Sequence, residues 1–521
     1  MTDHGEAPGA DDIVIGLDLG TTSTKAVAFT VSGEQLATAS HGYPLETPYP
    51  GHAVQNPDLI LAAAYAAVAE VVAAVGADRV RGLSFSSAMH SILGLDPLYR
   101  PMTEVITWGD TRAGLQAERL RAATGGLALH RRTGTPIHPM SPLTKLVWFR
   151  EQEPKLHETV AFWVGIKDYV IVHMCGALVV DHSLASASGL MNIHTLTWDD
   201  EALAIAGVSP EQLPELVRTR DVLPGITPDA AIAMGLPETT PVVVGAGDGP
   251  LANLGVGAVR PGVAACSIGT SGALRVGVDK PAVDPLGGVF CYALTEDRWV
   301  IGGAINNGGA TLDWARSILA DELGPGSEAE LLELAAAAQP GSGGLIMLPY
   351  LLSERAPHWS ALPKGAYIGL TRAHKREHLI RAALEGVCLQ LALVLQSMRS
   401  AGLEITQIRA TGGVMKSDLW REVLAAALGM TVDFAEGQEG SSFGAAVLGM
   451  EALGLIESID IVDQLIPVDD SVRPDPRSTA VYASLLPSFG QLYDALVPTF
   501  QTLRRLAPSL PIDLVGDEPD R

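Results

Sequence analysis

Two short glycine-threonine segments have the composition of phosphate-binding turns. Gly20-Thr21-Thr22-Ser23 and Gly269-Thr270-Ser271-Gly272 each stand between two apolar runs, which predicts a β-hairpin turn at each place. Glycine lets the backbone approach a phosphate closely, and successive N–H groups and hydroxyls can donate to its oxygens. An ordinary hairpin turn would explain either segment alone. Two such turns placed half a chain apart indicate a pair that grips one polyphosphate from opposite sides of a cleft.

Asp248 is the carboxylate best placed to accept a proton. It follows the apolar run 242–247 and has Gly247 and Gly249 on either side, which leave room for a small molecule. Sites in open α/β sheets gather at such strand ends, and a poorly nucleophilic hydroxyl needs a carboxylate within hydrogen-bond reach. The same residue could instead cap the helix that follows. Spacing alone does not decide between these interpretations.

The helices and strands that must position these residues are predicted to form two similar halves. A chain of 521 residues exceeds the size of one hydrophobic core, and 47% apolar residues suffice for two. Strands at 80–84 and 242–245 alternate with helices at 59–75, 377–400 and 419–428, which is typical of α/β layers. We expect an N-terminal domain at 12–260, a C-terminal domain at 261–455 and a C-terminal extension at 456–521. Residues up to 11 and beyond about 507 are expected to be loosely held.

Composition excludes several classes of function. A net charge of −24 argues against a nucleic-acid partner. The four cysteines, Cys175, Cys266, Cys291 and Cys388, form no C-x-x-C pair, so neither a disulfide framework nor a zinc site is expected. The first twelve residues lack the features of a secretory signal, and the apolar stretch 59–77 is interpreted as a packed helix and not as a membrane anchor. A cytoplasmic protein without a membrane partner is predicted.

Two longer motifs carry a resemblance to a known family. Residues 140–148 (MSPLTKLVW) resemble the first signature of the FGGY carbohydrate kinases, and 365–370 (GAYIGL), continuing to Glu385, resemble the second. The resemblance covers about 13–454 and implies an α/β fold of two duplicated actin/hexokinase-like (ribonuclease H-like) domains with a cleft between them. Within the family, 84–91 and 133–142 are most similar to gluconokinases. This implies ATP-dependent phosphorylation of D-gluconate to 6-phosphogluconate, with Mg²⁺.

The resemblance also implies roles for individual residues. Asp248 corresponds to the general base, and Asp18, just before the first turn, corresponds to the residue that orients Mg²⁺. The residues implied for the nucleotide are Gly20, Thr21, Thr22, Ser23, Lys25, Gly269, Thr270, Gly309, Gly412, Gly413 and Ser417, although many relatives have asparagine where Ser417 stands. The residues implied for the sugar are Met89, His90, Trp108, Asp110, Arg112, His138 and Lys167. Arg112 could hold a substrate carboxylate in bidentate fashion.

Other functions stay open from the sequence. Another kinase of the same family, acting on xylulose, ribulose or a polyol, is the alternative, because resemblance and not composition names gluconate. A non-catalytic ATP-dependent binding module on the same fold is a further alternative, although it would not need Asp248. The sequence does not give the oligomeric state, and a homodimer is one option.

Overall fold

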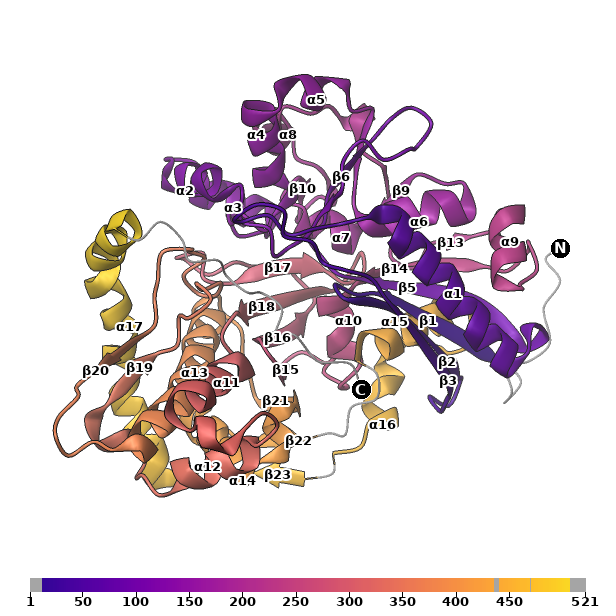
Figure 1. Cartoon of the computed structure of the whole chain (residues 1–521). Coiled ribbons are helices and arrows are strands. Elements are labelled where there is room, and N and C mark those ends of the chain that lie inside the picture. The colour runs from indigo at the N-terminus through magenta and orange to yellow at the C-terminus, as the bar shows by residue number, and fades with distance from the viewer. Residues whose placement is uncertain (1–11, 435–439, 469, 507–521) are drawn as a thin grey trace.

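The computed structural model describes residues 12–434, 440–468 and 470–506, and these form two α/β halves side by side (Figure 1). The first half is built on a six-stranded sheet in the order β13-β14-β5-β1-β2-β3. Its strands are β1 (Ile13–Leu19), β2 (Ser23–Thr30), β3 (Gln35–Gly42), β5 (Val80–Ser87), β13 (Val222–Leu223) and β14 (Val242–Gly247).

The second half repeats this sheet strand for strand. Its order is β17-β18-β16-β15-β21-β22-β23. The strands are β15 (Val263–Ile268), β16 (Gly272–Val278), β17 (Phe290–Ala293), β18 (Trp299–Ile305), β21 (Gln407–Gly412), β22 (Val432–Phe434) and β23 (Asp470–Val472). The β15–β16 pair is antiparallel and β15–β21 is parallel, as β1–β2 and β1–β5 are in the first half. Only the edge strand β17 is additional among the described strands, so the predicted duplication is confirmed.

Helices and short strands cover these sheets. The helices of the first half are α1 (Pro57–Val75), α2 (Gly114–Ala122), α3 (Gly126–Thr133), α4 (Pro142–Gln152), α5 (Pro154–Thr159), α6 (Ile166–Cys175), α7 (His182–Ala187), α8 (Asp200–Ala206), α9 (Pro228–Met234) and α10 (Asp248–Leu254). Those of the second half are α11 (Gly309–Leu319), α12 (Glu328–Ala336), α13 (Arg376–Ser400), α14 (Asp418–Leu428), α15 (Gly440–Ala452), α16 (Val462–Leu465) and α17 (Pro476–Leu506). The short strands are β4 (Val54–Gln55), β6 (Leu93–Leu95), β7 (Val105–Ile106), β8 (Phe162–Val164), β9 (Val179–Asp181), β10 (Met191–Asn192), β11 (Thr197–Trp198), β12 (Glu215–Val217), β19 (Ile346–Leu348) and β20 (Ala366–Ile368).

Two apolar helices occupy equivalent places in the halves. α1 begins at the cap Asn56, whose Oδ1 accepts the N–H groups of Asp58 and Leu59, and it packs on β2 and β3. α13 packs against β18, α11 and α14 and is almost entirely buried. By length and composition both could cross a membrane, but each contributes buried residues to the packing of its half.

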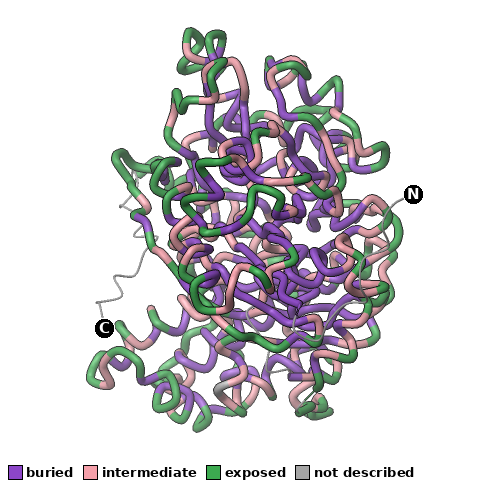
Figure 2. The backbone as a smooth tube through the Cα atoms, turned by 90° about the vertical axis from the view of Figure 1, so that its right-hand side faces the viewer, coloured by how far each residue is buried: buried purple, intermediate pink, exposed green. Residues whose placement is uncertain are grey.

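One hydrophobic cluster spans the two halves. α15 follows β22 in the chain but packs on β1 and β5 of the first sheet and on α10. Glycine permits this approach, because an added Cβ on Gly444 would lie 2.2 Å from the carbonyl oxygen of Leu251, and one on Gly16 would lie 2.0 Å from that of Ser442. Figure 2 shows buried backbone running through the middle of the molecule. The helices α10 and α15 therefore couple the two halves directly.

The segment expected as an extension contributes to the second half. β23 pairs with β22, and α17 packs on α13 and α14 and buries Tyr482, Phe489 and Phe500. The termini that the sequence predicts to be loosely held, 1–11 and 507–521, lie outside the described residues.

Candidate active site

A cavity of about 300 Å³ lies between the halves and draws side chains from both. From the first half come Thr21 of the first turn and Asp248. From the second half come Gly269 and Ser271 of the second turn. The two glycine-threonine turns and the candidate base therefore border one cavity.

The first turn is fixed by neighbouring side chains. The N–H of Gly20 donates to the carbonyl oxygen of Ser23 (3.0 Å), and Tyr43 Oη donates to the carbonyl oxygen of Gly20 (2.6 Å). Gln55 donates to the carbonyl oxygen of Thr21 (2.6 Å), while Trp108 Nε1 donates to Thr21 Oγ1 (2.9 Å). Lys25 pairs with Asp18 in the register of the hairpin, so both stand at the base of the turn.

The second turn gathers the other predicted nucleotide residues. The N–H of Gly309, at the start of α11, donates to the carbonyl oxygen of Gly269 (2.7 Å), and that of Gly308 donates to Thr270 (3.0 Å). Gly412 has a φ of 96°, and a Cβ there would lie 2.3 Å from the carbonyl oxygen of Ile268, so only glycine fits. Gly269, Thr270, Gly309 and Gly412 thus meet at one end of the second sheet.

Gly413 and Ser417 continue from this end toward α14. Gly413 follows Gly412 at the start of a short 3-10 turn. Ser417 is the N-cap of α14, and its Oγ accepts the N–H of Trp420 (3.4 Å). The cap gives Ser417 a structural role that does not need a ligand.

Asp248 is the first residue of α10 and directly follows β14. Gly247 and not Asp248 occupies the cap position, and Asp248 Oδ1 accepts the N–H of Gly249 (2.6 Å). Burial, with the charge of Asp18, raises the pKa of Asp248 to about 7, against the opposing effect of Arg275. A carboxyl with this pKa can exchange a proton near neutral pH.

Asp18 connects the halves. Its Oδ1 accepts a hydrogen bond from Ser86 Oγ (2.6 Å), and its Oδ2 accepts one from Ser441 Oγ of α15 (2.9 Å). Within the described ranges no group of three or more His, Cys, Asp or Glu side chains could hold a metal ion. A Mg²⁺ ion held by one carboxylate and several waters needs no such group.

Three of the predicted sugar-binding residues line the cavity: Met89, His90 and Trp108. His90 adopts a φ of 67°, and its Nδ1 lies 2.8 Å from the carbonyl oxygen of Ala187. Burial lowers the pKa of His90 to about 3, so its imidazole is neutral at neutral pH. The guanidinium of Arg355 lies over the Trp108 ring, 5.2 Å from its centroid.

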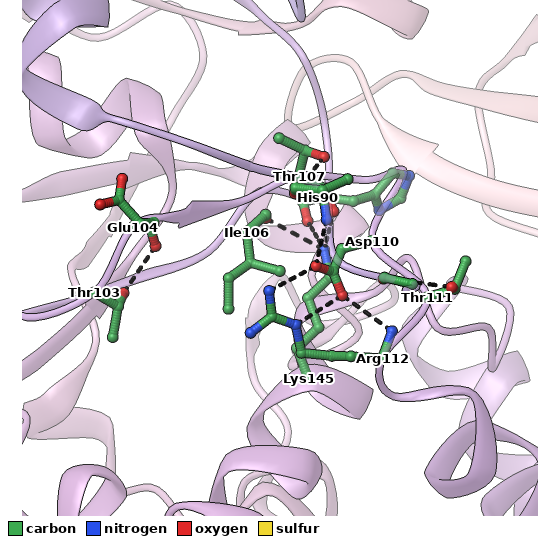
Figure 3. Close-up of polar contacts among 11 residues, drawn as sticks. His90, Thr103, Glu104, Ile106, Thr107, Asp110, Thr111, Arg112 and Lys145 are labelled. Atoms are coloured by element: carbon green, nitrogen blue, oxygen red, sulfur yellow. Dashed lines mark hydrogen bonds and ion pairs between the residues drawn. The ribbon is translucent and has the colours of Figure 1, made fainter. Parts of the chain in front are cut away.

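The other four candidates lie off the cavity wall. Asp110 accepts hydrogen bonds from Arg112 Nε (2.9 Å) and Nη2 (2.7 Å), and Figure 3 shows the two side chains facing each other. The Arg112 guanidinium also covers the Trp148 ring at 5.2 Å. The Arg112 guanidinium, which was expected to hold the substrate carboxylate, is therefore already bonded to Asp110.

His138 and Lys167 are both buried. The His138 ring lies 6.2 Å from that of Trp359, behind the wall. Lys167 Nζ donates to the carbonyl oxygen of Val244 (2.9 Å) and pairs with Asp181. Lys167 thus ties α6 to β14, the strand that presents Asp248.

Four polar residues of the cavity wall were not predicted as site residues: Ser267, Arg275, Tyr292 and Arg355. Arg355 Nε donates to Asn306 Oδ1 (2.7 Å), which holds its guanidinium in place. Its neighbour Glu354 is buried and accepts the N–H of Asn306 (2.6 Å). The signal for Arg275 was a single charged residue within an otherwise apolar strand, directly after the second turn.

Comparison with known proteins identifies the family. The model of the N-terminal domain of the FGGY family of carbohydrate kinases matches residues 13–255, and that of the C-terminal domain matches 264–453. The chain belongs to the FGGY family of carbohydrate kinases. Carbohydrate kinases of this family use ATP as the phosphate donor.

Relatives extend over nearly the whole chain. It is 42% identical over 505 residues to a gluconokinase of Bacillus licheniformis, covering 95% of this chain and 98% of the relative. It is 30% identical over 484 residues to a xylulose kinase of Bacillus subtilis, covering 92% and 96%. The crystal structure of gluconate kinase from Lactobacillus acidophilus superposes with a TM-score of 0.90 at 34% identity, covering 94% of this chain and 99% of that one. The predicted actin/hexokinase-like fold of two α/β domains is confirmed.

Proposed function

We propose that this protein transfers the γ-phosphoryl group of ATP to the 6-hydroxyl of D-gluconate, producing 6-phosphogluconate. One observation carries the proposal: Asp248 shares a cavity with Thr21 and with Gly269 and Ser271, so a candidate base stands beside both glycine-threonine turns. Similarity to gluconokinases over nearly the whole chain supports the choice of acceptor.

The two turns would hold the phosphates of ATP. The first offers Gly20, Thr21, Thr22 and Ser23, with Lys25 as a cation at its base, and the second offers Gly269 and Thr270. Gly269 supports this role because a Cβ there would meet no atom within 4 Å, so space remains beside the turn. Gly309, Gly412, Gly413 and Ser417 stand at the same end of the second sheet, where the rest of the nucleotide would lie.

Asp18 would orient Mg²⁺, directly or through water. Both of its oxygens accept hydrogen bonds from serines, which fixes the orientation of the carboxylate. When bound, the ion would neutralise charge on the transferring phosphoryl group.

Asp248 would act as general base. As the acceptor oxygen attacks the γ-phosphorus, the new O–P bond forms, the bond to the ADP oxygen breaks and the hydroxyl proton passes to Asp248. A pKa near 7 suits this exchange, because the group is ionised often enough to accept a proton and basic enough to hold it.

Met89, His90 and Trp108 would contact the acceptor. Trp108 offers an apolar face, and the neutral His90 imidazole can bond a hydroxyl. Asp110, Arg112, His138 and Lys167 would act indirectly, by holding the wall behind these residues. Two guanidiniums, of Arg275 and Arg355, border the cavity in a chain of net charge −24, which favours an anionic acceptor.

The test incubates purified protein with ATP, Mg²⁺ and each of a panel of acceptors and measures the release of ADP. Gluconate should give the highest kcat/KM among sugar acids, ketoses and polyols. Higher kcat/KM with xylulose would refute the proposal and favour the second candidate, which the 30% identity to a xylulose kinase supports. The proposed setting is the cytoplasm.

A further inference from the structure

Arg275 lies on the cavity-facing side of β16. Side chains alternate across a strand, and Ala273 and Arg275 line the cavity while Leu274 and Val276 are buried in the core. β16 begins next to the second turn and leads away from it. Arg275 is four residues beyond Ser271, about 13 Å of strand at about 3.3 Å per residue.

The Arg275 guanidinium is sparsely bonded within the described part of the chain. Nη1 donates to Ser267 Oγ over 3.5 Å, and among the described residues the Arg275 side chain makes no other hydrogen bond or ion pair. A guanidinium has five N–H donors. By contrast, Arg355 donates to Asn306 and to the carbonyl oxygen of Ile305, and Arg112 makes a bidentate pair with Asp110. Arg275 therefore retains donors that face the cavity.

The electrostatic setting of Arg275 calls for an anion. Burial lowers its pKa, and the charge of Asp248 counteracts this effect. Asp248 is an incomplete partner, because its own pKa of about 7 leaves it partly protonated at neutral pH and because the proposed transfer would neutralise it. A buried guanidinium without a counter-charge is destabilising.

We propose that Arg275 binds the carboxylate of the acceptor and thereby selects sugar acids over ketoses and polyols. The inference rests on the proposed function. The acceptor lies along β16, with its reacting hydroxyl beside Asp248 and its carboxylate at the Arg275 donors. A neutral acceptor of the same size leaves those donors buried without an anion, which is the arrangement by which binding sites reject analogues that lack a charged or hydrogen-bonding group.

The experiment compares wild type with Arg275→Met and Arg275→Lys. Methionine keeps a long unbranched side chain and removes the charge, while lysine keeps the charge and removes the fork. Arg275→Met should raise KM for gluconate by about 10-fold to 100-fold, the range of a lost charged hydrogen bond, and leave KM for ATP within about twofold. The KM of Arg275→Lys for gluconate should lie between the values of wild type and Arg275→Met. Activity toward xylulose or a polyol should not fall in Arg275→Met.

A third variant tests the competing arginine. Arg112→Met breaks the buried pair with Asp110 and should lower the temperature of unfolding, while raising KM for gluconate less than Arg275→Met does, because Arg112 does not line the cavity. Circular dichroism and thermal unfolding establish that Arg275→Met is folded. Titration calorimetry with gluconate then measures binding without turnover.

The outcomes separate the two proposals. Wild type without gluconate turnover overturns the proposed function, and this inference falls with it. Wild type active on gluconate, with an unchanged gluconate KM in Arg275→Met, overturns the inference alone. A rise in KM for ATP instead of gluconate also overturns it, because Arg275 would then serve the nucleotide phosphates. A selective loss of gluconate binding supports it.

Discussion

Replacing Gly444 by alanine tests how closely α10 and α15 must approach for Asp248 to work. The added Cβ would lie 2.2 Å from the carbonyl oxygen of Leu251, whereas ordinary contact begins at 3.4 Å, so the two helices must separate by about 1.2 Å. Leu251 lies three residues after Asp248 on α10, within one helical turn. Moving α10 away from α15 would therefore also displace Asp248, the candidate base.

The expected magnitude follows from two opposing effects. Alanine in a helix is favoured over glycine by about 0.5–1 kcal/mol. Overpacking opposes this and reduces the free energy of unfolding by about 1–3 kcal/mol. A misplacement of about 1 Å in a catalytic group can slow turnover about 10²-fold. Gly444→Ala should therefore show a modest loss of stability with a much larger loss of kcat.

The assay is kcat from ADP release, together with thermal unfolding of the same preparations. Gly114→Ala is the matched control, because Gly114 lies in the first turn of α2 and an added Cβ would meet nothing within 4 Å. This control should keep wild-type kcat and unchanged or slightly higher stability. If Gly444→Ala also kept wild-type kcat and stability, the close packing of the halves would not position Asp248.

Further predictions concern the base, its neighbour and the second turn. Asp248→Asn should lower kcat at least ~10²-fold while ATP still binds, as measured by calorimetry; near-normal turnover would exclude Asp248 as base. In wild type, kcat/KM for the acceptor should fall about tenfold per pH unit below about 7, because only ionised Asp248 accepts a proton. Asp18→Asn removes a charge that raises the pKa of Asp248, so the midpoint of this acid limb should move to lower pH, and an unmoved midpoint would refute the coupling. Gly309→Ala places a Cβ 2.9 Å from the carbonyl oxygen of Gly269 and should raise KM for ATP about tenfold with KM for gluconate unchanged; equal changes in both would argue against a nucleotide role.

Local pattern predicted most of the framework. Apolar runs bounded by Gly-Thr turns gave β1–β2 and β15–β16, because hairpins depend on neighbouring residues. The position of Asp248 after a buried strand made it a candidate, and the resemblance to the FGGY kinases favoured a base over a helix cap; the structure places it on the cavity wall. The hairpins needed no knowledge of contacts distant in the chain.

The sequence did not predict correctly which charged side chains face the cavity. Asp110 and Arg112 look like substrate ligands in a linear motif, but the side chain of Arg112 folds back onto Asp110 two residues earlier. Arg275 and Arg355 reach the cavity only because β16 and the loop before α13 meet the first half in the folded chain. Side-chain direction at such places depends on packing that spacing does not encode.

The packing of α15 on the first sheet has a consequence for any attempt to divide the chain. A fragment ending near 255 would keep β1 and β5 but lose α15, and would expose the apolar surface that this helix covers. The complementary fragment would carry α15 with no sheet to receive it. Fission at this linker would therefore leave two fragments that associate through these apolar surfaces and do not behave as independent monomers.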